Sequence, residues 1–288
     1  MKHISLINGQ FTDKISVLDR GLSYGDGFFE TMNWKYFLTT KVSKVEFWKR
    51  HLLRLKKGCE STLINFPSIS LIESYRDKIL KKSKKQGMSS GVLKIIITRG
   101  SGGRGYKFER NMIPNIILLV FPSLQYNEKN YKNGVNLKFC SSNLSINKNI
   151  AGFKHLNRLD SVVARSEWTN QNIFEGIITD IDGSVIEGTM TNIFCIKKSK
   201  LYTPIISEVG IKGIMRDVIL EKFCGYFKQT IEKKITVKFL LESDSVFITN
   251  SIIKIVPVKK LEKKKYKIHS AIRDLIKEIK NEKLLEYK

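Results

Sequence analysis

Residues 151–160 read Ala151-Gly-Phe-Lys154-His155-Leu-Asn157-Arg158-Leu-Asp160. Lys154 lies between two apolar side chains, Phe153 and Leu156, so we expect it to be partly buried. Burial disfavours the ammonium form and lowers the pKa, and a neutral amine is what a lysine needs to attack a carbonyl group. A Lys-His pair before a helix is also typical of a solvated turn, so the stretch indicates a reactive lysine only together with the rest of the chain.

The composition is that of a globular protein. The chain has 288 residues, enough for two domains, and 42% of them are hydrophobic. It has no apolar run of about 18 residues, and its first residues do not read as a signal peptide. Its cysteines are far apart and its few histidines show no metal-ligand spacing, which predicts free thiols, no metal site and a cytoplasmic location.

The formal net charge is +24, which raises the question of a nucleic-acid partner. The surplus is mostly lysine, spread through helices and loops, and no aromatic platform or recognisable nucleic-acid module accompanies it. We therefore expect neither a nucleic acid nor a membrane as partner. The charge can instead steer an anionic substrate towards the protein.

Apolar periodicity divides the chain into two domains joined by a polar, proline-containing linker. We predict a first domain over residues 1–121, a linker over 122–128 and a second domain over 129–288. In the first domain the predicted elements are a hairpin over 4–11 around Asn8-Gly9, a helix with its apolar face at 45–59, a helix over 70–86, and strands over 91–99 and 115–121.

In the second domain, strands alternate with a few helices. The predicted strands cover 134–140, 191–196, 246–251 and 252–258, and a hairpin covers 177–186 with its turn at Asp182-Gly183. The predicted helices run from about His155 to Trp168, from Gly213 through Phe223, and along a basic terminal segment whose apolar stripe extends from Ile268 to Ile279.

Four further segments accompany the lysine stretch. They are His51-Leu-Leu-Arg54-Leu55, Arg99-Gly-Ser-Gly-Gly-Arg104-Gly-Tyr106, Val185-Ile-Glu187-Gly-Thr-Met-Thr191-Asn192-Ile-Phe and Gly213-Ile-Met-Arg216. In this order the segments resemble the fold-type IV pyridoxal-phosphate enzymes, which include branched-chain and D-amino-acid aminotransferases. The glycine loop between arginines and the Lys-His-Leu-Asn-Arg-Leu run are most similar to the aminodeoxychorismate lyase branch.

The resemblance implies an α+β fold with a smaller N-terminal α/β domain and a larger C-terminal domain containing a barrel-like sheet. It also implies pyridoxal 5'-phosphate as cofactor, with Lys154 bonded to its aldehyde and Glu187 paired with its pyridine nitrogen. Free N–H groups at a helix start suit a phosphate. The predicted phosphate-binding residues are Arg54, Ile214, Met215, Asn250 and Ser251.

The same resemblance suggests which residues meet the substrate. Either Arg99 or Arg104 is expected to bind a carboxylate, because both flank the glycine loop. Arg158 stands where aminotransferase relatives tend to carry Tyr or Leu, and it is expected, with His155, to tune the environment of the site or to contact the substrate. The remaining candidates are Tyr24 beside the site and Thr31 in the catalytic set.

The implied reaction is elimination of pyruvate from 4-amino-4-deoxychorismate, which leaves p-aminobenzoate for folate biosynthesis. The implied assembly is a homodimer. A branched-chain or D-amino-acid aminotransferase would use the same lysine, acid and phosphate site, so transamination is the alternative function. A second alternative is a basic binding protein without activity on the same fold.

Overall fold

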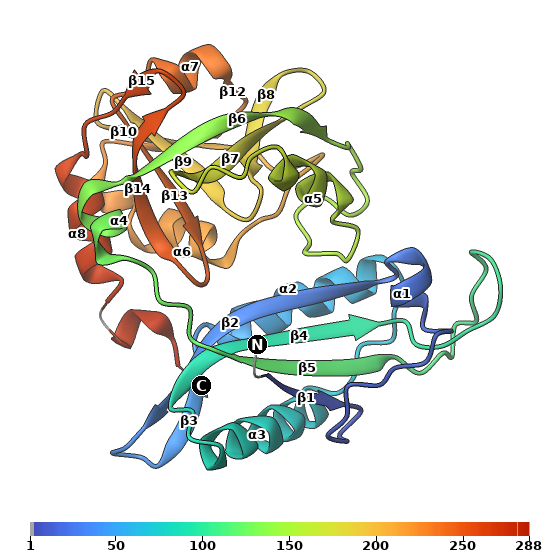
Figure 1. Cartoon of the computed structure of the whole chain (residues 1–288). Coiled ribbons are helices and arrows are strands. Elements are labelled where there is room, and N and C mark those ends of the chain that lie inside the picture. The colour runs from blue at the N-terminus through green and yellow to red at the C-terminus, as the bar shows by residue number, and fades with distance from the viewer. Residues whose placement is uncertain (1–2, 281, 288) are drawn as a thin grey trace. The chain divides into compact units, whose positions relative to one another are not determined.

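A computed structural model describes residues 3–280 and 282–287 (Figure 1). The chain forms two compact units. The first contains the described residues up to Gln125, together with Phe153–Asn157 and the described end of the chain from Leu285. The second contains Tyr126–Gly152 and the described residues between Arg158 and Leu284.

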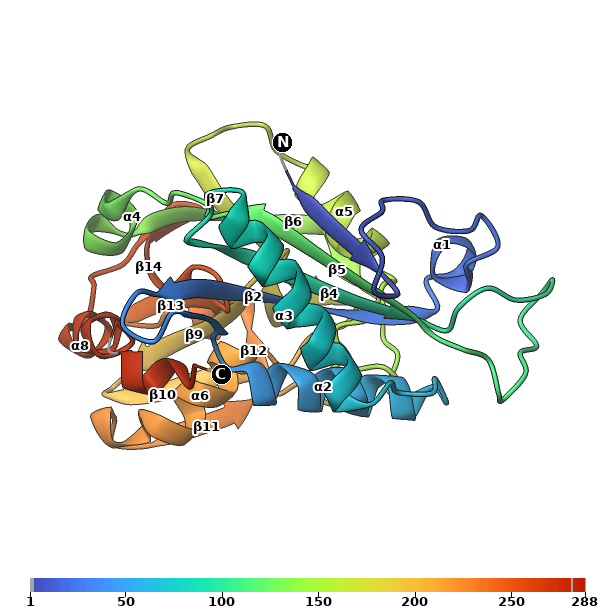
Figure 2. The same cartoon turned by 90° about the horizontal axis from the view of Figure 1, so that it is seen from below.

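The first unit is an antiparallel sheet covered by helices. Its strand order is β1-β5-β4-β2-β3. The strands are β1 (Ile4–Ile7), β2 (Gly27–Phe37), β3 (Val42–Val45), β4 (Ser90–Thr98) and β5 (Asn115–Pro122), and the helices are α1 (Arg20–Tyr24), α2 (Trp48–Ser61) and α3 (Ile69–Lys85). Helix α2 packs on β2, and α3 packs on β1 and β5, where Figure 2 shows it crossing the sheet.

Alternation in the strands and helical spacing in α2 build one core between these layers. Phe28, Met32 and Trp34 of β2 are buried in the same cluster as Trp48 and Leu55 of α2. Removing each large apolar side chain from water stabilises the unit by roughly 1.5–3 kcal/mol. The predicted apolar face is therefore confirmed from Trp48 to Cys59, whereas Val45, which the prediction placed on the same helix, ends strand β3.

The second unit contains a closed sheet. Strands β9, β13, β14, β6, β7 and β8 follow one another, and β8 pairs again with β9, which closes a six-stranded barrel. Its strands are β6 (Val135–Leu144), β7 (Ile173–Asp180), β8 (Ser184–Gly188), β9 (Asn192–Lys197), β13 (Ser245–Asn250) and β14 (Lys254–Leu261). The barrel-like sheet expected for the larger domain is confirmed.

Short elements surround this barrel. They are β10 (Lys200–Pro204), β11 (Thr230–Lys233), β12 (Ile235–Thr236), β15 (Lys264–Lys265), α4 (Glu128–Asn133), α5 (Leu159–Ser166), α6 (Ile214–Lys222), α7 (Val237–Leu241), α8 (Ser270–Glu278) and the 3-10 turn Cys224–Tyr226. A second 3-10 turn, Glu282–Leu285, follows α8 in the chain. The predicted terminal helix is confirmed as α8, which buries Ile272 and Leu275.

The predicted turn at Asn8-Gly9 forms and is closed by hydrogen bonds between Ile7 and Gln10 at 2.8 and 2.9 Å, but the predicted hairpin does not extend beyond it. Asn8 and Gly9 have positive φ angles of 49° and 80°, as the predicted turn requires. Beyond the turn, however, only an isolated bridge joins Ile7 to Gln10, and β1 pairs with β5 instead. The apolar residues of β5 bury more surface than a two-stranded hairpin could.

The helix expected from about His155 begins later, at Leu159. The intervening backbone is extended and bonds to β2: the Phe29 N–H donates to the Lys154 carbonyl at 2.9 Å, and the Leu156 N–H donates to the Gly27 carbonyl at 2.9 Å. Strand β3 pairs only with residues 34–37 of β2, so the lysine segment occupies the part of that edge which β3 leaves open. This pairing groups Phe153–Asn157 with the first unit.

Candidate cofactor and active site

Lys154 is half-buried, as its apolar neighbours predicted. Its Nζ lies 4.6 Å from the ring centroid of Phe29, and its backbone is held by β2. Phe29 and Thr31 occupy alternate positions of β2, so both side chains lie on the same face of that sheet. His155 forms an isolated bridge with Phe28 of the same strand. The first unit thus fixes the backbone of Lys154 along the edge of β2, and it places the Lys154 Nζ against Phe29.

Arg54 belongs to a buried ionic cluster between β2 and α2. Its Nε and Nη2 atoms lie 2.7 and 2.6 Å from the two carboxylate oxygens of Glu30, and His51 Nδ1 lies 2.6 Å from Glu30 Oε2. Burial would raise the pKa of Glu30, but the charges and hydrogen bonds of Arg54 and His51 outweigh it and lower that pKa to about 2. The cluster fixes the direction of the Arg54 guanidinium, which is 11% exposed.

The two arginines of the glycine loop have different environments. Arg99 is buried, and it binds both carboxylate oxygens of Asp26 and the carbonyls of Thr62 and Leu63. Arg104 is exposed. Of the two, Arg104 is therefore the one placed to meet a ligand, since Arg99 already uses its donors within the first unit.

The glycine loop itself is attached to α1. Arg20 donates to the carbonyls of Gly105 and Tyr106 at 2.9 and 3.2 Å, and the Gly105 N–H donates to the Tyr24 hydroxyl at 3.1 Å. The rings of Tyr24 and Tyr106 are 5.5 Å apart. Tyr24 therefore holds the loop that carries Arg104.

In the second unit, Glu187 is 4% exposed and is held at the end of β8. The Ile211 N–H donates to its Oε2 at 2.9 Å. Asn192, its cross-strand neighbour, has Nδ2 3.4 Å from the same oxygen and donates to the Ile211 carbonyl at 2.8 Å. The carboxylate is therefore oriented from two sides, as a group that holds a proton on a ring nitrogen must be.

Arg158 is near Glu187. Burial lowers the pKa of the Arg158 guanidinium, and the charges of Glu187 and Asp160 oppose this change by favouring the cation. Arg158 and Glu187 thus interact electrostatically within the second unit.

Helix α6 begins beside this acid. Its N-cap is Gly213, where an added Cβ would lie 2.0 Å from the Asn192 Oδ1 atom, so only glycine fits. Ile214 and Met215 open the helix, where N–H groups have no partner within the helix. The Thr249 hydroxyl, opposite Asn192 in the sheet, is fully buried and has no hydrogen-bond partner among the described residues.

The strand end that follows Thr249 forms a tight turn. Asn250 accepts hydrogen bonds from the N–H groups of Ile252 and Ile253 at 2.8 and 2.9 Å, and its amide donates to the Met190 carbonyl at 3.1 Å. The Asn250 side chain therefore orders the turn in which Ser251 lies.

The donor set of the second unit fits a phosphorylated pyridine ring. A buried carboxylate suits the ring nitrogen, and a helix N-terminus with an unpaired buried hydroxyl suits an anionic oxygen. Sequence reasoning did not single out Asn192 or Thr249. Asn192 is the cross-strand neighbour of the predicted Glu187, and Thr249 precedes the predicted Asn250 in the chain. No group of histidine, cysteine, aspartate or glutamate side chains suited to a metal occurs in residues 3–280 and 282–287.

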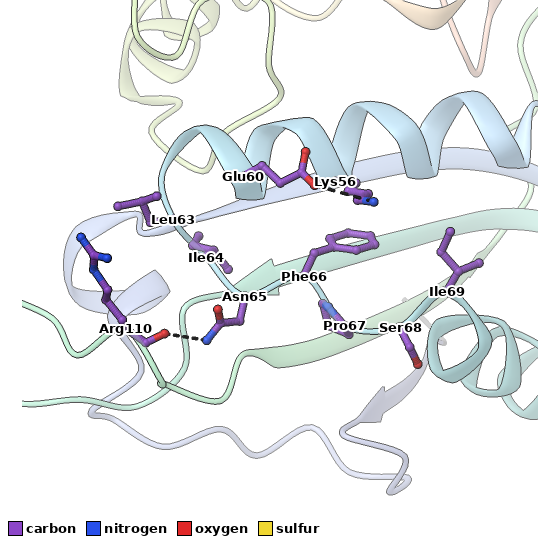
Figure 3. Close-up of a pocket in the computed structure, with 10 residues that line it drawn as sticks. All are labelled: Lys56, Glu60, Leu63, Ile64, Asn65, Phe66, Pro67, Ser68, Ile69 and Arg110. Atoms are coloured by element: carbon purple, nitrogen blue, oxygen red, sulfur yellow. Dashed lines mark hydrogen bonds and ion pairs between the residues drawn. The ribbon is translucent and has the colours of Figure 1, made fainter.

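A pocket of about 580 Å³ lies elsewhere in the first unit (Figure 3). It is bordered by the end of α2, the following loop and the start of α3. Its residues are Lys56, Glu60, Leu63, Ile64, Asn65, Phe66, Pro67, Ser68, Ile69 and Arg110. None of the predicted site residues lines it, so this pocket is not part of the candidate cofactor site.

Comparison with protein families matches residues 27–261 to the family described as Amino-transferase class IV. The chain belongs to this family, as the five sequence segments predicted. It is 31% identical to aminodeoxychorismate lyase of Vibrio harveyi over 280 residues, which covers 95% of this chain and 97% of the relative. It is 26% identical to D-alanine aminotransferase of Bacillus licheniformis, covering 89% and 88% of the two chains.

Among solved structures, 4-amino-4-deoxychorismate lyase of Pseudomonas aeruginosa superposes with a TM-score of 0.87 at 32% identity. The match covers 96% of this chain and 98% of that one. The two-unit fold is therefore that of the family over nearly its whole length. Within the described residues, no helix has both the length and the apolar character needed to cross a membrane.

Proposed function

We propose that the chain is a pyridoxal-phosphate-dependent 4-amino-4-deoxychorismate lyase that releases pyruvate and p-aminobenzoate. The observation that carries the proposal is the buried Glu187 carboxylate, whose Oε2 atom is held by the Ile211 N–H and lies near the Asn192 amide, as an acid paired with a ring nitrogen requires. The relatives named as aminodeoxychorismate lyases support the same activity, at 31% and 32% identity.

The cofactor, when bound, supplies an aldehyde for covalent attachment and a ring that accepts electrons from the substrate. Glu187 keeps a proton on the ring nitrogen, because the Ile211 N–H and Asn192 orient its carboxylate. Lys154 would hold the cofactor covalently through its Nζ, and the same amine would serve as the base that takes a proton from the amine-bearing carbon of the substrate.

Each predicted phosphate-binding residue offers a donor or a positive charge. The N–H groups of Ile214 and Met215 donate from the start of α6, where the helix dipole also favours an anion. Ser251 and the amide of Asn250 add donors, and Arg54 contributes a cation whose direction Glu30 fixes.

The substrate carries two carboxylates, which need basic partners. Arg104 is assigned to one of them, because its exposed guanidinium lies on the loop that Tyr24 holds. Arg158 and His155 are assigned to the second carboxylate and to the surroundings of the substrate. Thr31 is assigned to the catalytic set because it lies on the same face of β2 as Phe29, whose ring Lys154 Nζ contacts. Loss of the pyruvyl group makes the ring aromatic, so the elimination needs no external oxidant.

Transamination is the second candidate function, and the 26% identity to a D-alanine aminotransferase favours testing it. The same Lys154 and Glu187 would serve both reactions. The two functions differ in their products: an aminotransferase supplied with a D- or branched-chain amino acid and 2-oxoglutarate forms glutamate, whereas a lyase forms pyruvate without an acceptor.

The test is to load the purified chain with pyridoxal 5'-phosphate, add 4-amino-4-deoxychorismate and measure p-aminobenzoate and pyruvate. Equal amounts of the two products are expected, and Lys154→Ala should form neither. Borohydride reduction followed by mass spectrometry should place the cofactor on Lys154. Robust glutamate formation from amino acids, with no pyruvate released from 4-amino-4-deoxychorismate, would contradict the lyase. A chain that takes up no cofactor would support the non-catalytic alternative. We further propose a cytoplasmic homodimer, which light scattering would test for its oligomeric state.

A further inference from the structure

Glu175, in β7, is a fully buried carboxylate that has no part in the function proposed above. Its Oε1 accepts the N–H groups of Gly176 and Thr189 at 2.9 and 3.1 Å and the Thr189 hydroxyl at 2.6 Å. Its Oε2 accepts the N–H of Met190 and the hydroxyl of Thr191, both at 3.1 Å. Four of these five donors belong to the turn of residues 188–191.

This turn joins two site residues. It follows Glu187 at the end of β8 and precedes Asn192 at the start of β9. Its Met190 carbonyl also accepts a hydrogen bond from Asn250. The turn that Glu175 holds is therefore continuous with β8, which carries Glu187, and is hydrogen-bonded to Asn250, a predicted phosphate-binding residue.

Gly188, in this turn, lies very close to the Glu175 carboxylate. An added Cβ at Gly188 would lie 2.9 Å from the Glu175 carboxyl carbon and 2.3 Å from the Thr191 hydroxyl, so a side chain there would displace the carboxylate. Burial raises the pKa of Glu175, and the hydrogen bonds from Thr189, Gly176, Met190 and Thr191 act against that change.

We propose that Glu175 is a positioning residue, whose buried carboxylate holds the 188–191 turn so that Glu187 and Asn250 are placed for the cofactor. The inference rests on the proposed function and adds to it a residue that touches neither cofactor nor substrate. Both oxygens are required, because each accepts at least one backbone N–H.

Glu175→Gln tests this requirement with almost no change of shape. Glutamine has one acceptor oxygen and an NH2 group, so in either orientation the NH2 group faces a backbone N–H, of Met190 or of Gly176 and Thr189. The turn must shift to relieve this contact. An unpaired buried donor costs enough to change an equilibrium constant about tenfold, so we expect the dissociation constant for pyridoxal 5'-phosphate to rise by about that factor.

Glu167→Gln is the matched control. Glu167 also accepts several hydrogen bonds, from Lys138 Nζ, the N–H groups of Ser141 and Ser142 and the Ser142 hydroxyl, but it holds an irregular part of β6 instead of the site turn. We expect it to lower stability in urea while leaving cofactor affinity unchanged. Thr189→Val removes one donor to Glu175 and should weaken cofactor binding by about threefold, which provides a variant that folds if Glu175→Gln does not.

The measurements are cofactor affinity, the pH dependence of the bound cofactor's absorption band, and unfolding in urea. Glu175→Gln should change the first two, whereas the control should change only the third. Wild-type affinity and pH dependence in Glu175→Gln, or in Thr189→Val if the former does not fold, would overturn this inference alone. A wild-type chain that binds no cofactor would overturn the proposed function, and the cofactor role of Glu175 with it.

Discussion

Glu30→Gln should destabilise the first unit strongly at neutral pH and weakly in acid. The ordinary pKa of this carboxyl is 4.5, and the cluster with Arg54 and His51 lowers it to about 2. Each unit of pKa difference corresponds to 1.36 kcal/mol, so the ionised carboxylate stabilises the folded state by about 3 kcal/mol near pH 7. Breaking a buried pair by removing one partner costs about 3–5 kcal/mol, which agrees with this figure.

The pH dependence follows from the direction of the pKa change. Because the folded pKa lies below the unfolded one, the stabilisation is complete above the unfolded value and is lost as the pH falls towards the folded value. At about pH 3.5 it should be about 2 kcal/mol, and near pH 2 most of it should be gone.

Urea unfolding followed by tryptophan fluorescence measures this difference. Trp34 and Trp48 are buried in the first unit, and Trp168 is in the second, so a Trp168→Phe background reports on the first unit alone. Glu60→Gln is the control. Within the part of the chain that the structure describes, the Glu60 side chain forms an exposed ion pair with Lys56 and no other, so its loss should cost less than about 0.5 kcal/mol. A loss of stability in Glu30→Gln that is below about 1 kcal/mol, or the same at both pH values, would refute the reasoning.

Three further predictions concern ligand binding. Arg104→Ala should raise KM by about tenfold or more with the cofactor still bound, whereas Arg99→Ala should mainly lower stability, by about 3 kcal/mol. Steady-state kinetics measures the first effect and urea unfolding the second. An unchanged KM in Arg104→Ala would rule out a substrate-binding role for Arg104. Thr249→Val should leave the cofactor-free chain as stable as the wild type or more so, yet weaken cofactor binding about tenfold; equal affinity would show that this hydroxyl does not meet the cofactor. Asn192→Ala removes a donor near Glu187 and should cost about 1 kcal/mol of stability and shift the pH profile of kcat; an unshifted profile would contradict its coupling to the acid.

Some of the site could be predicted from residue order alone. Lys154, Glu187 and Arg54 stand in recognisable short segments, and the helix at Gly213 follows from glycine before an apolar run. Apolar periodicity likewise predicted the face of α2, because burial depends on spacing within a single element. These features are local, so they can be read without knowing what the element packs against.

Sequence by itself determined the family, and it predicted a two-part division and the chemical types of the candidate site residues. Tertiary structure alone decided their partners: Glu30 as the group that orients Arg54, Arg99 as an internal contact with Asp26, and Glu175 as the holder of the 188–191 turn. It also decided that Lys154 lies in an extended segment on β2 and not in a helix. The physical reason is that hydrogen bonds and ion pairs between residues far apart in the chain depend on which strands pair, and strand pairing leaves no short-range pattern in the sequence.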